Sequence, residues 1–130
     1  MKKRLLGHTV YKTQYHISWN TKYRHDILEG DVRIYLGLLL FKVLETLPGC
    51  ELVEYSIQPD HVHMLVIIPP KYSVSRVVGR IKGKTASKIR AKFPELQESY
   101  WKNNTLWSTG FYVSSVGWSE KKTLEYIQKQ

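Results

Sequence analysis

The sequence is poor in cysteine and has no long apolar run, and each absence excludes a class of protein. A single cysteine, Cys50, stands in 130 residues, which excludes an internal disulfide and a zinc site built from several cysteines. The longest apolar run, residues 64–68, ends at Pro69 and is too short to cross a membrane. The basic residues 2–4 are followed by only two leucines, so no secretory signal is expected. These absences predict a protein of a reducing cytoplasm.

Glycine-rich phosphate-binding loops are also missing. The nearest pattern, Gly79 and Gly83, has neither a preceding strand nor the spacing of such a loop, so no nucleotide cofactor is expected. The 130 residues are 42% hydrophobic and 24% charged, which is typical of a folded globular protein. This length predicts a single domain over residues 1–130.

Acidic residues are absent from two segments of the chain. The whole sequence has 20 Lys and Arg against 11 Asp and Glu, a net charge of +9. Residues 1–25 hold six basic residues and residues 71–92 hold eight, with no acidic residue in either segment. A positive field of this kind attracts a polyanion, because each neutralised phosphate releases a counterion. Nucleic acid is the predicted partner, and the alternative is a basic helix face that is only solvated.

Hydrophobic periodicity predicts six main elements and one more helix. Residues 9–19 alternate as a strand does, and a helix is expected over 31–47, before Pro48-Gly49. A hairpin of strands 51–57 and 61–68 follows, then a helix from the Ser73 cap to Pro94, a loop anchored by Tyr100, Trp101 and Trp107, a strand over 111–116, and a C-terminal helix over 119–130. This order predicts an α+β fold, a ferredoxin-like β-α-β-β-α-β two-layer sandwich with a four-stranded antiparallel sheet.

Basic residues recur every four positions along the second predicted helix. They are Arg76, Arg80, Lys84, Lys88 and Lys92. A step of four residues advances the side chain by about 40° on an α-helix, so these bases are expected to form one slowly winding ridge beside the apolar stripe.

Two histidines stand at the start of the third predicted strand. His61 and His63 are two residues apart, so both imidazoles are expected on one face of the strand. Two neutral imidazoles side by side suit a divalent metal. The alternative is a strand face with two polar side chains beside a turn.

Tyr126 and Gln130 lie one turn apart on the last predicted helix. The phenol of Tyr126 is able to attack phosphorus once it is deprotonated, and the amide oxygen of Gln130 is a neutral ligand that complements two histidines. The alternative is a tyrosine that packs beside Leu124 and Ile127.

At these places the sequence resembles the single-tyrosine HUH transposases of bacterial and archaeal insertion sequences, the TnpA type of the IS200-like family. The resemblance covers nearly the whole chain in order. Its motifs are Tyr15-His16 with Trp19, Lys22-Tyr23-Arg24, Pro59-Asp60-His61-Val62-His63-Met64-Leu65, Lys82-Gly83-Lys84-Thr85-Ala86-Ser87, Leu106-Trp107, Tyr112-Val113, Val116-Gly117 and Glu125-Tyr126-Ile127-Gln128-Lys129-Gln130.

The resemblance implies a set of catalytic residues and a cofactor. His61, His63 and Gln130 are expected to bind a metal, Mg²⁺ with Mn²⁺ as a substitute. Tyr126 is the expected nucleophile, which cleaves one DNA strand and leaves a 5′-phosphotyrosine and a free 3′-OH.

The resemblance also implies partners. The expected DNA partner is single-stranded DNA with hairpin ends. The chain is also expected to form an obligate homodimer with a second copy of itself, in the cytoplasm of a prokaryote. The residues predicted to bind DNA are Lys22, Arg24, Arg76, Arg80, Lys82, Lys84 and Lys88. Two alternatives are a non-catalytic nucleic-acid-binding module on the same fold and a domesticated relative that keeps the chemistry but does not move its own element.

Overall fold

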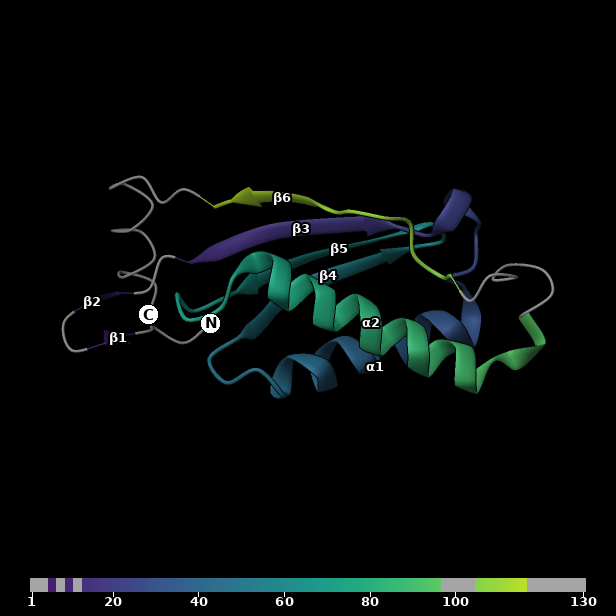
Figure 1. Cartoon of the computed structure of the whole chain (residues 1–130), viewed down its shortest axis with the longest axis horizontal. Helices are drawn as coiled ribbons and strands as arrows, with labels where there is room; N and C mark the ends of the chain where they lie inside the picture. The colour runs from purple at the N-terminus through teal and green to yellow at the C-terminus, as the bar shows by residue number, and fades with distance from the viewer. Residues whose placement is uncertain (1–4, 7–8, 11–12, 97–104, 117–130) are drawn as a thin grey trace.

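A four-stranded antiparallel sheet forms one layer of the molecule (Figure 1). The computed structural model describes residues 5–6, 9–10, 13–96 and 105–116. The strands are β3 (Gln14–Asn20), β4 (Glu51–Gln58), β5 (His61–Ile67) and β6 (Tyr112–Ser115). Their order across the sheet is β4-β5-β3-β6, so β3 and β5 form its centre.

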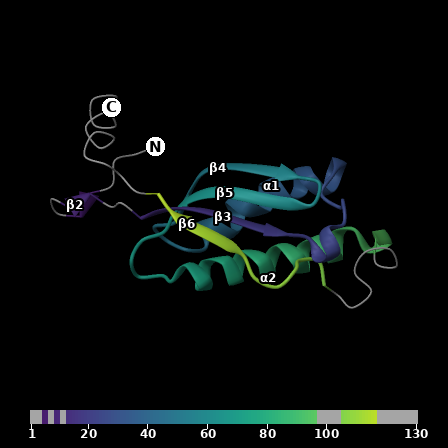
Figure 2. The same ribbon diagram turned by 90° about the horizontal axis from the view of Figure 1, so that it is seen from above.

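Two helices form the second layer and cover one face of the sheet (Figures 1 and 2). They are α1 (Gly30–Glu45) and α2 (Val74–Lys92). Short 3-10 turns, η1 (Lys22–Arg24) and η2 (Pro94–Leu96), and a two-stranded sheet of β1 (Leu5–Leu6) and β2 (Thr9–Val10) complete the described elements. The predicted α+β arrangement of four antiparallel strands and two helices is confirmed, whereas the predicted helix over 119–130 lies outside the described residues. Neither α1 nor α2 is long and apolar enough to span a membrane.

The core lies between the sheet and the helices. Alternation along β3 and β5 sends one set of side chains toward the helices, and these side chains are almost fully buried: Ile17, Trp19, Val62, Met64 and Val66. The stripe predicted on α2 is buried against them at Val77, Val78, Ile81 and Ile89. The opposite face of β3 and β5 carries His16, Ser18, His61 and His63, and the helices leave it open.

Trp107 ties the loop before β6 to this core. Its ring meets that of Trp19 edge to face at a centroid distance of 5.8 Å. Its Nε1 donates a hydrogen bond of 3.1 Å to Oγ1 of Thr85, a buried side chain of α2. The prediction of a loop anchored by aromatic residues is confirmed at Trp107, while Tyr100 and Trp101 lie outside the described residues.

The predicted strand over residues 9–19 is wrong as a single strand. Thr9 and Val10 pair with β1 in the small sheet, whereas β3 begins at Gln14, opposite Ile67 at the end of β5. An alternating pattern shows which face is apolar but does not show which neighbour each part of the strand pairs with.

The other predicted elements differ from the structure by one or two residues at their ends. β4 runs one residue further and β5 and β6 are slightly shorter than predicted. α1 ends at Glu45 rather than at 47, because the chain turns at Thr46 and passes through Gly49 with φ 93°. A β-carbon on Gly49 would lie 2.9 Å from Cγ of Pro69. α2 begins as predicted, with the Ser73 hydroxyl accepting a hydrogen bond from the Arg76 N–H at 3.1 Å.

Candidate functional site

β5 presents His61 and His63 on the open face of the sheet. Their neighbours Val62 and Met64 are fully buried toward the helices, so alternation places the two histidines on the opposite side. Both histidines are partly exposed. Residues i and i+2 of a strand are separated by about 7 Å along the strand, so the imidazoles lie side by side as the spacing predicts.

Asp60 holds the first of these imidazoles. Its Oδ1 accepts a hydrogen bond of 2.7 Å from Nδ1 of His61, and its Oδ2 accepts one of 2.8 Å from Nε of Arg24. The hydrogen bonds from His61 and Arg24 hold the pKa of the Asp60 carboxyl below its usual value. The contact to Nδ1 leaves Nε2 of His61 as the nitrogen available to a ligand.

Backbone hydrogen bonds fix the turn that carries Asp60. The Thr21 N–H donates to the carbonyl of Asp60 and the Leu28 N–H donates to that of Pro59, both at 2.9 Å. The buried Thr21 hydroxyl donates to the carbonyl of His25 at 2.7 Å. The segment from Thr21 to Leu28 therefore serves as a frame for the turn between β4 and β5.

A different contact holds the second imidazole. The rings of His63 and His16 stack with centroids 5.2 Å apart and planes 22° apart. His63 lies opposite Ser18 of β3, and Ser18 lies opposite Tyr112 of β6. The open face is therefore lined by polar side chains from three neighbouring strands, and Ser18 of β3 lies between His63 of β5 and Tyr112 of β6.

The two histidines fit a divalent metal. They are partly exposed and share a face, and the hydrogen bond at Nδ1 of His61 leaves the other ring nitrogen available to a ligand. Within the described ranges, no three His, Cys, Asp or Glu side chains gather closely enough to form a metal site. The predicted third ligand, Gln130, and the predicted nucleophile, Tyr126, lie outside those ranges.

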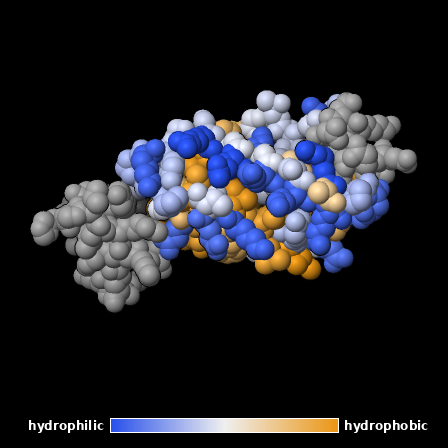
Figure 3. All heavy atoms as spheres, turned by 60° about the horizontal axis from the view of Figure 1, so that its bottom comes forward, coloured by the Kyte–Doolittle hydropathy of each residue, from blue (hydrophilic) through white to orange (hydrophobic). Residues whose placement is uncertain are grey.

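The basic ridge of α2 lies on the other side of the molecule from the histidines. The five predicted bases, Arg76, Arg80, Lys84, Lys88 and Lys92, are all exposed. Arg80, Lys84 and Lys88 line a groove between α1 and α2. Hydrophilic side chains lie beside apolar ones on the helix side of the molecule in Figure 3. The predicted ridge is present, but the sheet and the helix layer separate it from His61 and His63.

Lys82 differs from its basic neighbours on α2. Its ammonium group donates hydrogen bonds of 2.8 Å to the carbonyls of Ser108 and Gly110. Burial lowers the pKa of Lys82 below its usual value. The spacing of charges in the sequence gives no sign of this contact, because it depends on the loop before β6 folding back onto α2.

The two bases of η1 lie at the same end of the sheet as the histidine pair. Lys22 places its ammonium group 5.2 Å from the centre of the Tyr23 ring, and Arg24 is paired with Asp60. The sequence predicts Arg24 as a DNA contact but does not reveal its ion pair with the residue beside His61. The only sign of this ion pair in the sequence is that an aspartate, Asp60, directly precedes His61.

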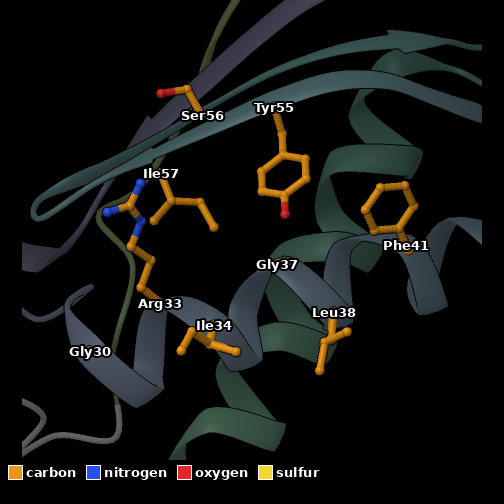
Figure 4. Close-up of a pocket in the computed structure, with 9 residues that line it drawn as sticks. All are labelled: Gly30, Arg33, Ile34, Gly37, Leu38, Phe41, Tyr55, Ser56 and Ile57. Atoms are coloured by element: carbon orange, nitrogen blue, oxygen red, sulfur yellow. The ribbon is translucent and has the colours of Figure 1, made fainter.

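A separate apolar groove lies between α1 and β4 (Figure 4). Its lining includes Ile34, Leu38 and Phe41 of α1 and Tyr55 and Ile57 of β4, and the rings of Phe41 and Tyr55 meet edge to face at a centroid distance of 5.7 Å. Tyr55 reaches the helix side of the sheet because a bulge between Leu52 and Glu54 shifts the register of β4. None of the residues predicted from the sequence as site residues lines this groove.

Two histidines side by side on the open face of a four-stranded antiparallel sheet are the arrangement that the resemblance to the HUH transposases predicts. Residues 9–130 match the family model described as "Transposase IS200 like". The chain belongs to the IS200-like transposases of bacterial insertion sequences, a membership that implies a DNA-cutting enzyme. The predicted family is confirmed.

Individual relatives agree with this family. The transposase for insertion sequence element IS200 of Salmonella typhimurium LT2 is 37% identical over 125 residues, which cover 96% of this chain and 81% of that protein. The ISDra2 transposase TnpA of Deinococcus radiodurans is 31% identical over 122 residues, which cover 93% of this chain and 86% of that protein.

Two solved structures share the fold. A crystal structure from Deinococcus radiodurans R1, described as a transposase, superposes with a TM-score of 0.76 and 32% identity over 99% of this chain and 98% of that one. The REP-associated tyrosine transposase bound to a REP hairpin gives a TM-score of 0.61 and 14% identity over 95% of this chain and 68% of that one. The second likeness is one of fold alone.

Proposed function

We propose that this chain cuts and rejoins single-stranded DNA at the ends of an insertion sequence, in the cytoplasm of a prokaryote. The observation that carries the proposal is the pair of imidazoles of His61 and His63. β5 holds them side by side on the open face of the sheet, in a chain that belongs to a transposase family.

Tyr126 is the proposed nucleophile. Its phenol oxygen attacks the scissile phosphorus in line with the 3′-oxygen, so one P–O ester bond forms as the other breaks. The phenol gives up its proton to a base or to water, and the departing 3′-oxygen takes one up. One phosphate ester bond replaces another, so the 5′-phosphotyrosine keeps the energy of the broken DNA bond. A 3′-OH can therefore attack the phosphotyrosine, release the tyrosine and rejoin the DNA.

His61, His63 and Gln130 are the proposed metal ligands. Mg²⁺ is the expected ion, and Mn²⁺ is at least as well suited to two imidazoles. A bound divalent cation would neutralise the non-bridging oxygens and stabilise the departing 3′-oxygen. Asp60 and His16 hold the two imidazoles through the contacts described above.

The DNA substrate is proposed to contact two faces of the protein. The REP-associated tyrosine transposase is bound to a DNA hairpin, and we propose a hairpin substrate for this chain as well. Within the basic ridge, Arg76, Arg80, Lys84 and Lys88 offer exposed cations for a phosphate backbone on the helix side. Lys22 and Arg24 lie near the histidine pair and would contact the strand to be cut.

Two copies of the chain are proposed to act together as a homodimer. The family resemblance supports an arrangement in which the helix that bears Tyr126 in one copy completes the metal site of the other. Mixing of two inactive variants tests this arrangement and is described in the Discussion.

A non-catalytic nucleic-acid-binding module is the second candidate function. The observation that favours it is the position of the basic ridge, which is separated from the histidine pair by the sheet and helix layers. Binding at the ridge alone would need neither the histidines nor Tyr126.

Covalent capture of DNA distinguishes the two functions. The full chain is incubated with single-stranded and double-stranded forms of its element's ends and Mg²⁺, and the products are separated by denaturing electrophoresis. We expect a protein–DNA adduct with the single strand only, which EDTA prevents and excess Mg²⁺ or Mn²⁺ restores. Tight binding of the hairpin without any adduct, with either metal, would favour the binding module.

A further inference from the structure

Tyr23 of η1 is the most exposed of the large apolar and aromatic side chains that the structure describes. It is 77% exposed, and it stands between two cations in the order Lys22-Tyr23-Arg24. Proteins that hold single-stranded nucleic acid combine cations for the phosphates with aromatic rings on which bases stack. Resting on the proposed function, in which a single DNA strand crosses the open face, we propose that Tyr23 is a stacking platform for an unpaired base of that strand.

The position of η1 brings Tyr23 to the end of the sheet that carries the histidine pair. β3 ends at Asn20, which lies opposite His61 at the start of β5, and η1 begins two residues later. In Figure 1, η1 lies at the end of β3, on the side of the sheet away from α1 and α2. Tyr23 is three residues beyond Asn20, so its Cα lies within about 11 Å of the Cα of Asn20. A base stacked on Tyr23 therefore belongs to a nucleotide close to the phosphate at the histidine pair.

The backbone of η1 is fixed before any DNA binds. The Thr21 N–H donates a hydrogen bond of 2.9 Å to the carbonyl of Asp60. The Lys22 N–H donates one of 2.8 Å to the carbonyl of Leu106, so two distant segments hold the start of the turn. The Thr21 hydroxyl closes the turn with a hydrogen bond of 2.7 Å to the carbonyl of His25. A platform that is rigid in advance loses little conformational entropy when a base stacks on it.

Tyr23 occupies this place in spite of backbone strain. Its φ of 56° lies in the left-handed region, where a bulky residue is an outlier and glycine or asparagine is favoured. Strain of this kind is concentrated at functional sites. Turning the chain needs no aromatic side chain, so the strained position of Tyr23 points to a role for the ring itself.

Two neighbouring side chains contact the ring of Tyr23 and leave most of it open. The ammonium group of Lys22 lies 5.2 Å from the ring centre. The ring of His25 meets it at an angle of 72°, with centroids 5.9 Å apart. With these contacts Tyr23 is still 77% exposed, so a base has access to the ring. The ammonium group of Lys22 is then beside the stacked nucleotide and neutralises its phosphate.

Equilibrium binding of unpaired DNA by the full chain tests the platform without cleavage. The probe is a fluorescent single strand that flanks the hairpin at the element's end, measured by anisotropy in EDTA. Tyr23→Asn removes the ring but suits the left-handed backbone, so the turn should persist. We expect Tyr23→Asn to weaken binding about 5- to 100-fold, the loss of one base–aromatic stack, and Tyr23→Phe to bind like the wild type. The salt dependence should not change in Tyr23→Asn, because no phosphate contact is lost.

Two controls separate this stack from other losses of affinity. Tyr55→Leu removes another exposed phenol ring, which lies beside the groove between α1 and β4, and it should leave DNA binding unchanged. The second control is the hairpin without its flanking strand, which Tyr23→Asn should bind as tightly as the wild type does. A loss for the hairpin alone, with none for the flanking strand, would place the stacked base in the hairpin loop and overturn the proposal.

Photochemical cross-linking identifies the stacked ring in the wild type, without any variant. 5-Iodouracil is placed at successive positions of the flanking strand, and irradiation joins the halogenated base to an aromatic ring that lies against it. Mass spectrometry of the digested product should find the base on the peptide that contains Tyr23.

The outcomes distinguish this inference from the proposed function. If the wild type does not bind the flanking strand, the proposed function is wrong and the platform with it. If the wild type binds the strand while Tyr23→Asn keeps full affinity and the cross-link falls on another residue, only the stacking role is overturned. A loss of affinity that Tyr23→Phe shares with Tyr23→Asn would also overturn it, because the hydroxyl group rather than the ring would then carry the contact.

Discussion

At the scale of single residues, Lys82 differs from the exposed Lys84 and Lys88 of α2 because its ammonium group donates two hydrogen bonds inside the protein. Replacing Lys82 by Met removes two charge-assisted hydrogen bonds to the carbonyls of Ser108 and Gly110. We expect Lys82→Met to lower the free energy of unfolding in urea by about 1–3 kcal/mol. Lys84→Met, at an exposed position of the same helix, should change it by less than about 0.5 kcal/mol. Equal effects of the two substitutions would contradict this role for Lys82.

The phenol of Tyr126 is the group whose loss best separates cleavage from binding. Tyr126→Phe removes one hydroxyl group, and a phenyl ring has no oxygen to attack phosphorus. We expect this variant to bind hairpin DNA with unchanged affinity and to form no covalent adduct, as measured by gel shift and by denaturing electrophoresis. An adduct in Tyr126→Phe would assign the nucleophile to another residue, Tyr112 or Tyr100 being the next candidates.

At the scale of elements, the start of α2 depends on a single side-chain cap. The Ser73 hydroxyl accepts the Arg76 N–H, one of the donors that the first turn of a helix leaves unsatisfied. Ser73→Ala should therefore destabilise the chain by about 1 kcal/mol in urea unfolding. Ser75→Ala, at an exposed position inside the same turn, is the matched control and should be close to neutral. A neutral Ser73→Ala would mean that another group takes over the cap.

The basic ridge makes a prediction about DNA affinity rather than stability. Reversing Arg80, Lys84 and Lys88 to Glu should weaken DNA binding for all sequences, because phosphate contacts carry no sequence information. The slope of log affinity against log salt should flatten by about 0.7–0.9 for each phosphate that the variant no longer neutralises. Fluorescence anisotropy at several salt concentrations measures both quantities. An unchanged affinity and slope would show that the ridge is only solvated.

At the scale of the whole molecule, the sheet separates two kinds of surface. The histidine pair lies on the open face, and the exposed bases of α2 lie on the helix side beside the groove between α1 and α2. A DNA hairpin held at the ridge must therefore send its single strand around the molecule, or to a second copy, to reach the histidines. This separation is the structural reason to test for shared active sites.

Mixing two inactive variants tests whether the active sites are shared between copies. One variant is Tyr126→Phe and the other is His63→Ala. If a helix from one copy completes the metal site of the other, a mixed dimer keeps one site with both wild-type halves, and partial cleavage returns. Adduct formation after co-refolding measures this recovery. No recovery, with mixed dimers shown by mass, would mean that each copy contains a complete site.

The sequence by itself determined the layers of the fold and the location of the histidine pair. Both follow from short-range periodicity: alternation places His61 and His63 opposite the buried Val62 and Met64, and the 3.6-residue period gives α2 its buried stripe and its basic ridge. The Ser73 cap is equally local. These features depend on residues within a few positions of one another, so the amino-acid sequence alone is enough to predict them.

Only the tertiary structure decided the contacts between segments that are distant in the sequence. Arg24 and Asp60 are separated by 36 positions and Lys82 and Ser108 by 26, and neither pair has a periodic signal. The division of residues 9–19 between two sheets was likewise decided by pairing partners. Such contacts form when folding brings distant segments together, because the polar groups that become buried there need hydrogen-bond partners. Charge and spacing along the sequence therefore show which residues are basic, while the fold decides which of them still face the solvent.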